Sequence, residues 1–255
     1  MTIQEPDWKG YASKVHEWIQ EAYTRVYESQ EGMSAEQSKV GLVASYCLLA
    51  AHDYMEIAFF AFNKKLYHPG MACLRPVAEM AITFLWCTSS VEDYIDRLSR
   101  WMKVPFDKAR KDHDRLEEWV MSDLDKESFA SRKREWDGHY QRLFANVEGN
   151  LPSVLNMLKE IDDRQGGEAS FQGLYPMLYS TLCNSAHGTL VLDRYFTPTA
   201  SAIGRRQHPP MPNHAPWASL TATVYLVVGV YQFFGWEHSK FLKEYRQMLE
   251  VAPKT

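Results

Sequence analysis

One apolar stretch of the chain carries two opposite charges at helical spacing. Within residues 71–87, MACLRPVAEMAITFLWC, the only charged residues are Arg75 and Glu79, four positions apart. Residues four apart lie on the same face of a helix, and a charge removed from water needs a partner because its desolvation is costly. We therefore expect Arg75 and Glu79 to form a pair that is at least partly buried. The planar guanidinium of Arg75 could there bind an anion through two parallel hydrogen bonds.

A second apolar stretch carries a stripe of polar residues. In LYSTLCNSAHGTLVL, Ser180, Asn184 and His187 occupy positions i, i+4 and i+7, which is the spacing of one helix face. A histidine titrates near neutral pH and can serve as an acid or a base. We expect Arg75, Glu79 and His187 to line one pocket as its catalytic residues, with Asn184 as a ligand contact.

A third apolar stretch, LLAAHDYMEIAFFAF, is interrupted by His52, Asp53 and Glu56. His52 and Glu56 are again four residues apart, so they share a helix face. The core of a helical bundle can bring such residues together from several helices, and we expect these three to bind the ligand as well. The alternative is that every one of these polar residues is simply hydrogen bonded, as most buried polar groups are.

The residues that could hold a metal ion or a cofactor form no complete set. The chain has no Glu-x-x-His pair of the kind that binds di-iron in helical bundles, and its four cysteines form no C-x-x-C pair. No nucleotide-binding fingerprint occurs either. We expect neither a metal nor a cofactor. Because each cysteine lies in an apolar run, reduced core cysteines and a cytoplasmic location are expected.

Helical periodicity predicts the elements that position these residues. Apolar residues recur at three- and four-residue spacing from Pro6 to about Gln30. Ser34 and Gln37 then have the spacing of a capping box, which predicts a second helix to about Leu66.

Prolines and glycines predict where the later helices begin and end. The HPG tripeptide at residues 68–70 should turn the chain into the helix that holds Arg75. The further predictions are a cap formed by Ser90 and Asp93, a helix end at Pro105, a helix start at Pro152, a helix over residues 171–196, a Pro-rich loop over residues 197–216 and one long last helix to Glu250.

These elements predict an all-α fold. No stretch alternates between apolar and polar residues as a half-buried strand does. Long helices joined by short turns favour a multi-helix up-and-down bundle with antiparallel neighbours. We expect one domain over residues 1–255, with a charged helical segment at residues 106–150.

One uncharged stretch, residues 218–236, is long enough to span a membrane. Its threonines, tyrosines and glutamine favour the core helix of a soluble protein instead, so a membrane partner is not expected. The N-terminal residues lack the features of a signal peptide. The formal net charge of −4 gives no overall basic excess for binding nucleic acid.

The motifs of the two apolar stretches resemble bacterial all-helical families of unknown function over about residues 42–192. The resemblance is carried by Arg75, Pro76, Glu79 and Trp86 and by the later Asn184 and His187. Some of these families are similar to HEPN-like proteins, many of which are metal-independent ribonucleases of toxin and phage-defence systems. Such ribonucleases have an Arg and a His four to six residues apart. Here only Arg134 and His139, in REWDGHYQR, have that spacing.

The sequence leaves three functions open. The first is binding of a small or anionic ligand in the Arg75, Glu79 and His187 pocket, with or without catalysis. The second is a HEPN-like ribonuclease, for which the partner would be RNA. The third is a non-catalytic interaction protein whose exposed aromatic residues mediate a homo-oligomer.

Overall fold

The computed structural model describes residues 6–90, 92–117, 123–164, 171–180, 182–183, 196–198, 203–205 and 214–251. These residues are mostly helical, which confirms the predicted all-α fold. Two compact units are present: residues 1–89 together with 154–255, and residues 90–153. That the whole chain is a single domain stays a prediction.

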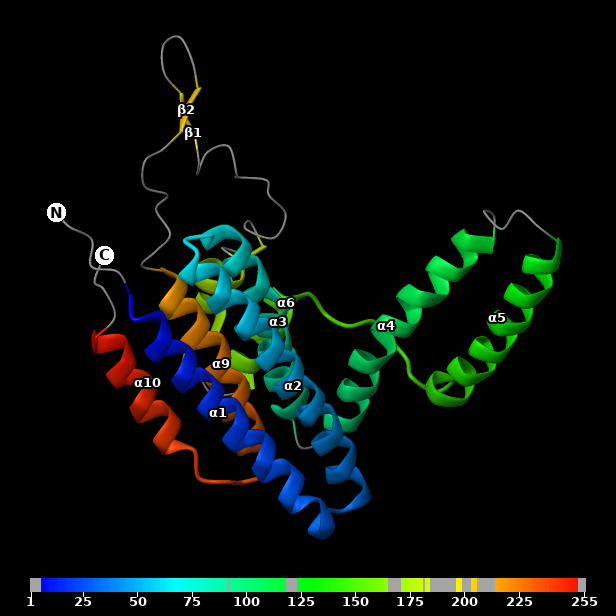
Figure 1. Ribbon diagram of the computed structural model, residues 1–255. Coiled ribbons are helices and arrows are strands. Elements are labelled where there is room, and N and C mark those ends of the chain that lie inside the picture. The colour runs from blue at the N-terminus through cyan, green and yellow to red at the C-terminus, as the bar shows by residue number, and fades with distance from the viewer. Residues whose placement is uncertain are drawn as a thin grey trace. The chain divides into compact units, whose positions relative to one another are not determined.

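The first unit is a bundle of long helices (Figure 1). Its helices are α1 (Trp8–Ser29), α2 (Ala35–Asn63), α3 (Tyr67–Thr88), α6 (Val154–Arg164), α9 (His214–Phe233) and α10 (Ser239–Val251). The helix α3 packs against α2, α6 and α9, and α1 packs against α2 and α9. The apolar composition of α3 therefore corresponds to a central place in the bundle.

The predicted capping box opens α2. The Ser34 side chain accepts a hydrogen bond from the backbone N–H of Gln37 at 3.2 Å, and the Gln37 side chain accepts one from the N–H of Ser34 at 3.0 Å. Two N–H groups that the helix cannot satisfy are thereby paired. At its other end, α2 stops where Lys65 adopts a positive φ of 60°.

Two predicted helix breaks are wrong. The HPG tripeptide forms part of the first turn of α3, where a proline is tolerated because no intrahelical N–H bond is required of it. Pro105 lies inside α4 (Tyr94–Glu117), which continues past it. A proline removes one hydrogen bond from a helix, and directly after Pro105 the ring of Phe106 packs against Trp136 and Phe144 of α5.

The predicted last helix is in fact two helices. Gly235 adopts a positive φ of 68°, and its N–H donates to the carbonyl of Gln232 at 3.1 Å. The N–H of Trp236 donates to the carbonyl of Tyr231 at 2.8 Å. This pair of bonds is the Schellman motif that ends a helix at a left-handed glycine, so α9 stops and α10 starts in a new direction.

The predicted helix over residues 171–196 is also wrong in part. The structure has a 3-10 turn at Phe171–Gly173 and a π-helix, η3, at Tyr175–Tyr179. Phe196 begins the strand β1 (Phe196–Pro198), which pairs antiparallel with β2 (Ile203–Arg205) inside the predicted loop. Among the described residues these are the only strands, so no sheet of three strands is formed there.

The second unit contains α4 and α5 (Asp123–Phe144). The two helices carry most of the charged segment predicted for residues 106–150, and they pack through an aromatic cluster of Phe106, His113, Trp136, Tyr140 and Phe144. Before α4, the N–H of Asp93 donates to the Ser90 hydroxyl at 3.3 Å, which confirms the predicted cap.

The α9 helix is buried along almost its whole length, which confirms the core helix predicted within residues 218–236. Two of its hydroxyl groups donate to its own backbone, Ser219 to the carbonyl of Ala215 and Thr223 to that of Ser219, each at 2.9 Å, and the Thr221 hydroxyl lies 2.9 Å from that of Tyr245 on α10. In the described part of the chain, α3 is the one helix long and apolar enough to cross a membrane by length and composition. Most of it is buried against the other helices, as in a soluble protein.

Candidate functional site

Arg75 and Glu79 meet on α3, as their spacing predicted. The Arg75 Nε lies 3.9 Å from a Glu79 carboxylate oxygen, and the two side chains are 27% and 48% exposed. The distance is too long for a hydrogen bond, so the contact is an ion pair. The pair is less buried than the sequence suggested, and a ligand can reach it from solvent.

A tyrosine that the sequence analysis did not single out joins this pair. Tyr179 is the last residue of the π-helix η3, and its interaction with Arg75 raises the pKa of the guanidinium. Because a guanidinium has only donors, the Tyr179 oxygen is the one group of the two that can accept a hydrogen bond. Cys183, one helical turn later, also contributes to the raised pKa of Tyr179. The site is therefore built from α3 and from the segment that follows α6.

Burial and charge fix the protonation of this cluster. Burial raises the pKa of Tyr179 to about 12 and Glu79 acts in the same direction, against the opposing effect of Arg75. Burial by itself would lower the pKa of Arg75, but Tyr179, Cys183 and Glu79 raise it on balance. At neutral pH, Arg75 is thus a cation and Tyr179 a neutral hydroxyl.

The helix α6 connects α3 to the π-helix. The Trp86 indole donates to the Glu160 carboxylate at 2.7 Å, which joins α3 to α6. Asp162, also on α6 and only 8% exposed, accepts hydrogen bonds from the N–H groups of Phe171 and Gln172 at 2.6 and 3.0 Å. These bonds hold the start of the segment that carries Tyr179. Trp86, part of the motif that the sequence analysis noted, thus has a positioning role.

Two predicted members of the site lie outside the described residues. They are His187 and Asn184, which follow Cys183 in the sequence. The prediction that they share a pocket with Arg75 and Glu79 therefore stays a prediction.

The polar residues of α2 have different neighbours. The His52 ring stacks on the His16 ring of α1, with centroids 4.5 Å apart, and its Nδ1 lies 3.7 Å from Asp53. Burial lowers the pKa of His16, and His52 lowers it further, while Glu56 opposes the change. Asp53 and Glu56 are on the exposed face of α2. These contacts form a cluster between α1 and α2 that involves neither Arg75 nor Tyr179.

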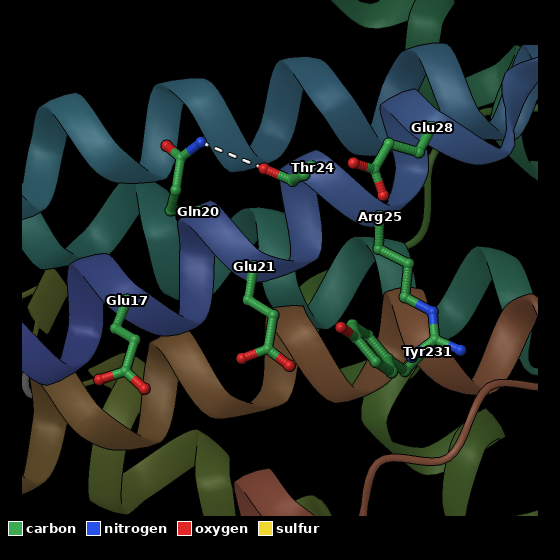
Figure 2. Close-up of a pocket in the computed structure, with 7 residues that line it drawn as sticks. All are labelled: Glu17, Gln20, Glu21, Thr24, Arg25, Glu28 and Tyr231. Carbon is green, nitrogen blue, oxygen red and sulfur yellow. Dashed lines mark hydrogen bonds between the residues drawn. The ribbon is translucent and has the colours of Figure 1, made fainter.

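An open groove of about 610 Å³ lies along α1 and beside α9. Figure 2 shows its lining residues: Glu17, Gln20, Glu21, Thr24, Arg25 and Glu28 from α1, and Tyr231 from α9. Two of its carboxylates, those of Glu17 and Glu21, are paired with Lys14 at 2.7 Å and Lys240 at 2.6 Å. The Arg25 guanidinium lies over the Tyr231 ring at 5.1 Å. None of the predicted site residues lines this groove.

The close Arg and His pair of the ribonuclease alternative lies on α5. Five residues correspond to about 140° of rotation around a helix, so Arg134 and His139 point in different directions. Each bonds to its own helix: Arg134 donates to the carbonyl of Ala130 at 3.3 Å, and His139 contacts Arg142 at 2.9 Å. The ribonuclease alternative stays a prediction.

Within the described ranges, no three His, Cys, Asp or Glu side chains are grouped to hold a metal ion. Sequence reasoning missed His16, a polar residue beside Val15 in the first helix, and Tyr179, which lies in a mostly apolar stretch. The one signal for Tyr179 was its position four residues before Cys183. No family model matches the chain, and neither the curated proteins nor the solved structures contain a match.

Proposed function

We propose that the chain binds a small ligand with an anionic group, a carboxylate or a phosphate, at Arg75 and Tyr179. One observation carries this proposal: a partly buried arginine interacts with a tyrosine that ends a π-helix. π-helical turns are rare and are frequently found at functional sites. A purely structural salt bridge between Arg75 and Glu79 would not require one.

The protonation states support an anion as the ligand. Since the pKa of Tyr179 is about 12, its hydroxyl keeps its proton at neutral pH and can donate a hydrogen bond. The guanidinium donates through a planar fork that matches two oxygens of a carboxylate or phosphate. The half-exposed Glu79 only accepts, so it would contact a hydroxyl or amino group on the same ligand.

The remaining assignments rest on the sequence. Should the bound ligand react, His187 is the proposed acid or base and Asn184 a ligand contact. A cytoplasmic location is proposed from the cysteines, and the burial that raises the pKa of Cys47 to about 12 supports an unreactive, reduced thiol there.

Thermal unfolding in the presence of anions tests the proposal. Inorganic phosphate or acetate, compared with chloride at equal ionic strength, should raise the unfolding temperature of the native chain because ligands stabilise the state they bind. Arg75→Lys keeps the charge but loses the fork, so it should abolish most of this shift. Arg25→Lys, which changes the arginine stacked on Tyr231, is the control and should show the same rise in unfolding temperature as the native chain. Equal shifts in Arg75→Lys and the native chain would contradict the proposal.

A further inference from the structure

The helix α2 is apolar on two opposite faces. One face is buried in the bundle, through residues such as Ala44, Leu48, Met55 and Phe62. The other face carries five large apolar side chains that remain exposed. They are Leu42, Tyr46, Leu49, Ile57 and Phe60, with exposed fractions of 51%, 66%, 47%, 54% and 63%. We call these five residues the α2 stripe.

The α2 stripe lies on one face of the helix in two apolar parts, Leu42 to Leu49 and Ile57 to Phe60, with the exposed Asp53 between them. Its members are three, four or eight residues apart, so they lie within about 80° of one another around the helix. They extend over most of a helix of 29 residues, which is about 43 Å long. Single exposed apolar residues are normal in proteins, but a contiguous apolar patch of several hundred Å² usually marks an interaction site.

From this pattern we propose that the α2 stripe binds the same stripe of a second copy of the chain, with the two α2 helices antiparallel. In a two-fold symmetric interface each position of the stripe meets its symmetry-related position on the other copy. Leu42 and Phe60 are centred on residue 51 and form the apolar pair of this register, whereas Leu49 is placed opposite Asp53. In an antiparallel pair crossing at this point, Leu42 of one copy faces Phe60 of the other.

Polar residues of the same face fit this register. Tyr46 and Glu56 are also centred on residue 51, so the Tyr46 hydroxyl of one copy can donate to the Glu56 carboxylate of the other. Asp53 is the unfavourable member, because the two copies bring their Asp53 carboxylates toward the same crossing point. Like charges at such a place weaken association.

The available area suits a dimer of moderate affinity. Five side chains that are about half exposed offer on the order of 500 Å² per chain, and a typical stable interface buries about 800 Å² per partner. Residues that flank the stripe along α2 can contribute the difference. The stripe itself contains no lysine or arginine, so no basic side chain has to be desolvated in its centre.

Sedimentation velocity over a wide range of protein concentrations tests the dimer. The native chain should sediment as a dimer at high concentration. Tyr46→Ser should raise the dissociation constant by about tenfold or more, since central aromatic residues dominate interfaces. Tyr27→Ser is the matched control, because Tyr27 on α1 is 64% exposed and lies outside the stripe; it should leave the constant unchanged. Asp53→Asn should tighten the dimer.

Cysteine cross-linking tests the register. Leu42→Cys and Phe60→Cys chains, mixed and oxidised, should form a disulfide-linked dimer. The Leu42→Cys chain alone should give no more disulfide-linked dimer than the native chain does. In the antiparallel pair its two introduced cysteines would be about 27 Å apart along the helices. A chain that stays monomeric at every concentration, or a dimer that Tyr46→Ser and Tyr27→Ser weaken equally, would overturn the proposal.

Discussion

Arg75 shows how solvent exposure changes the contribution that an ion pair is expected to make to stability. Replacing one partner of a fully buried pair costs about 3 to 5 kcal/mol, which is what the apolar surroundings of Arg75 in the sequence suggest. The structure leaves its partner Glu79 48% exposed at 3.9 Å. The pair is therefore closer to a surface salt bridge, whose contribution is about 1 kcal/mol or less.

We accordingly expect Arg75→Ala to lower the free energy of unfolding by about 1 kcal/mol, most of it through lost packing and the lost interaction with Tyr179. Urea denaturation of the variant and the native chain measures this difference. Arg75→Lys, which keeps the charge, should lower the free energy of unfolding by less than Arg75→Ala does. A loss near 4 kcal/mol for Arg75→Ala would mean that the pair is buried in solution and that this account of the site is wrong.

His16 gives the protein a predicted sensitivity to acid. Its pKa is lowered from 6.5 by burial and by the adjacent His52 ring. The unfolded chain thus binds a proton at a higher pH than the folded chain does. The stability that His16 contributes is present above pH 6.5 and is lost as the pH falls through its folded pKa.

Thermal unfolding at about pH 7 and about pH 5 measures this effect. His52→Gln removes one source of the lowered pKa, so this variant should lose less stability on acidification than the native chain. His139→Gln, on the exposed face of α5, is the control and should behave as the native chain does. If His52→Gln and the native chain respond equally to acid, the two stacked rings are not coupled.

At the scale of elements, local side-chain patterns predicted helix starts well and helix ends poorly. Ser34 with Gln37 and Ser90 with Asp93 were readable because each cap is made by residues three apart in sequence. Pro105 was misleading because packing between α4 and α5 outweighs one lost hydrogen bond. Gly235 was passed over because a glycine inside an apolar run does not reveal its φ.

Two glycines make a matched pair of predictions with opposite signs. Gly235 has a φ of 68° at the end of α9, so Gly235→Ala should destabilise the protein by about 1 kcal/mol. Gly138 lies inside α5 with no atom near the position of an added Cβ. Gly138→Ala should therefore stabilise by up to about 1 kcal/mol. Denaturant unfolding of both variants measures these values, and the same sign for both would contradict the helix ends described here.

At the scale of the molecule, the sequence predicted the all-α architecture because hydrophobic periodicity is a local property. It predicted Arg75 and Glu79 as a pair for the same reason. It could not predict Tyr179, since the contact between α3 and the π-helix depends on how α6 joins the two segments. Nor could it predict the α2 stripe. Both faces of α2 are apolar in the sequence, and only the structure shows that one of them is exposed.

The claim that Arg75 and Tyr179 act as one anion-binding site has a direct test. Calorimetric titration with inorganic phosphate would compare the native chain, Arg75→Lys, Tyr179→Phe and the double variant. Residues that hold the same ligand oxygens are coupled, so the double variant should lose less binding free energy than the sum of the two single losses, by about 0.5 to 3 kcal/mol. Losses that simply add, or phosphate binding that neither substitution weakens, would contradict the account.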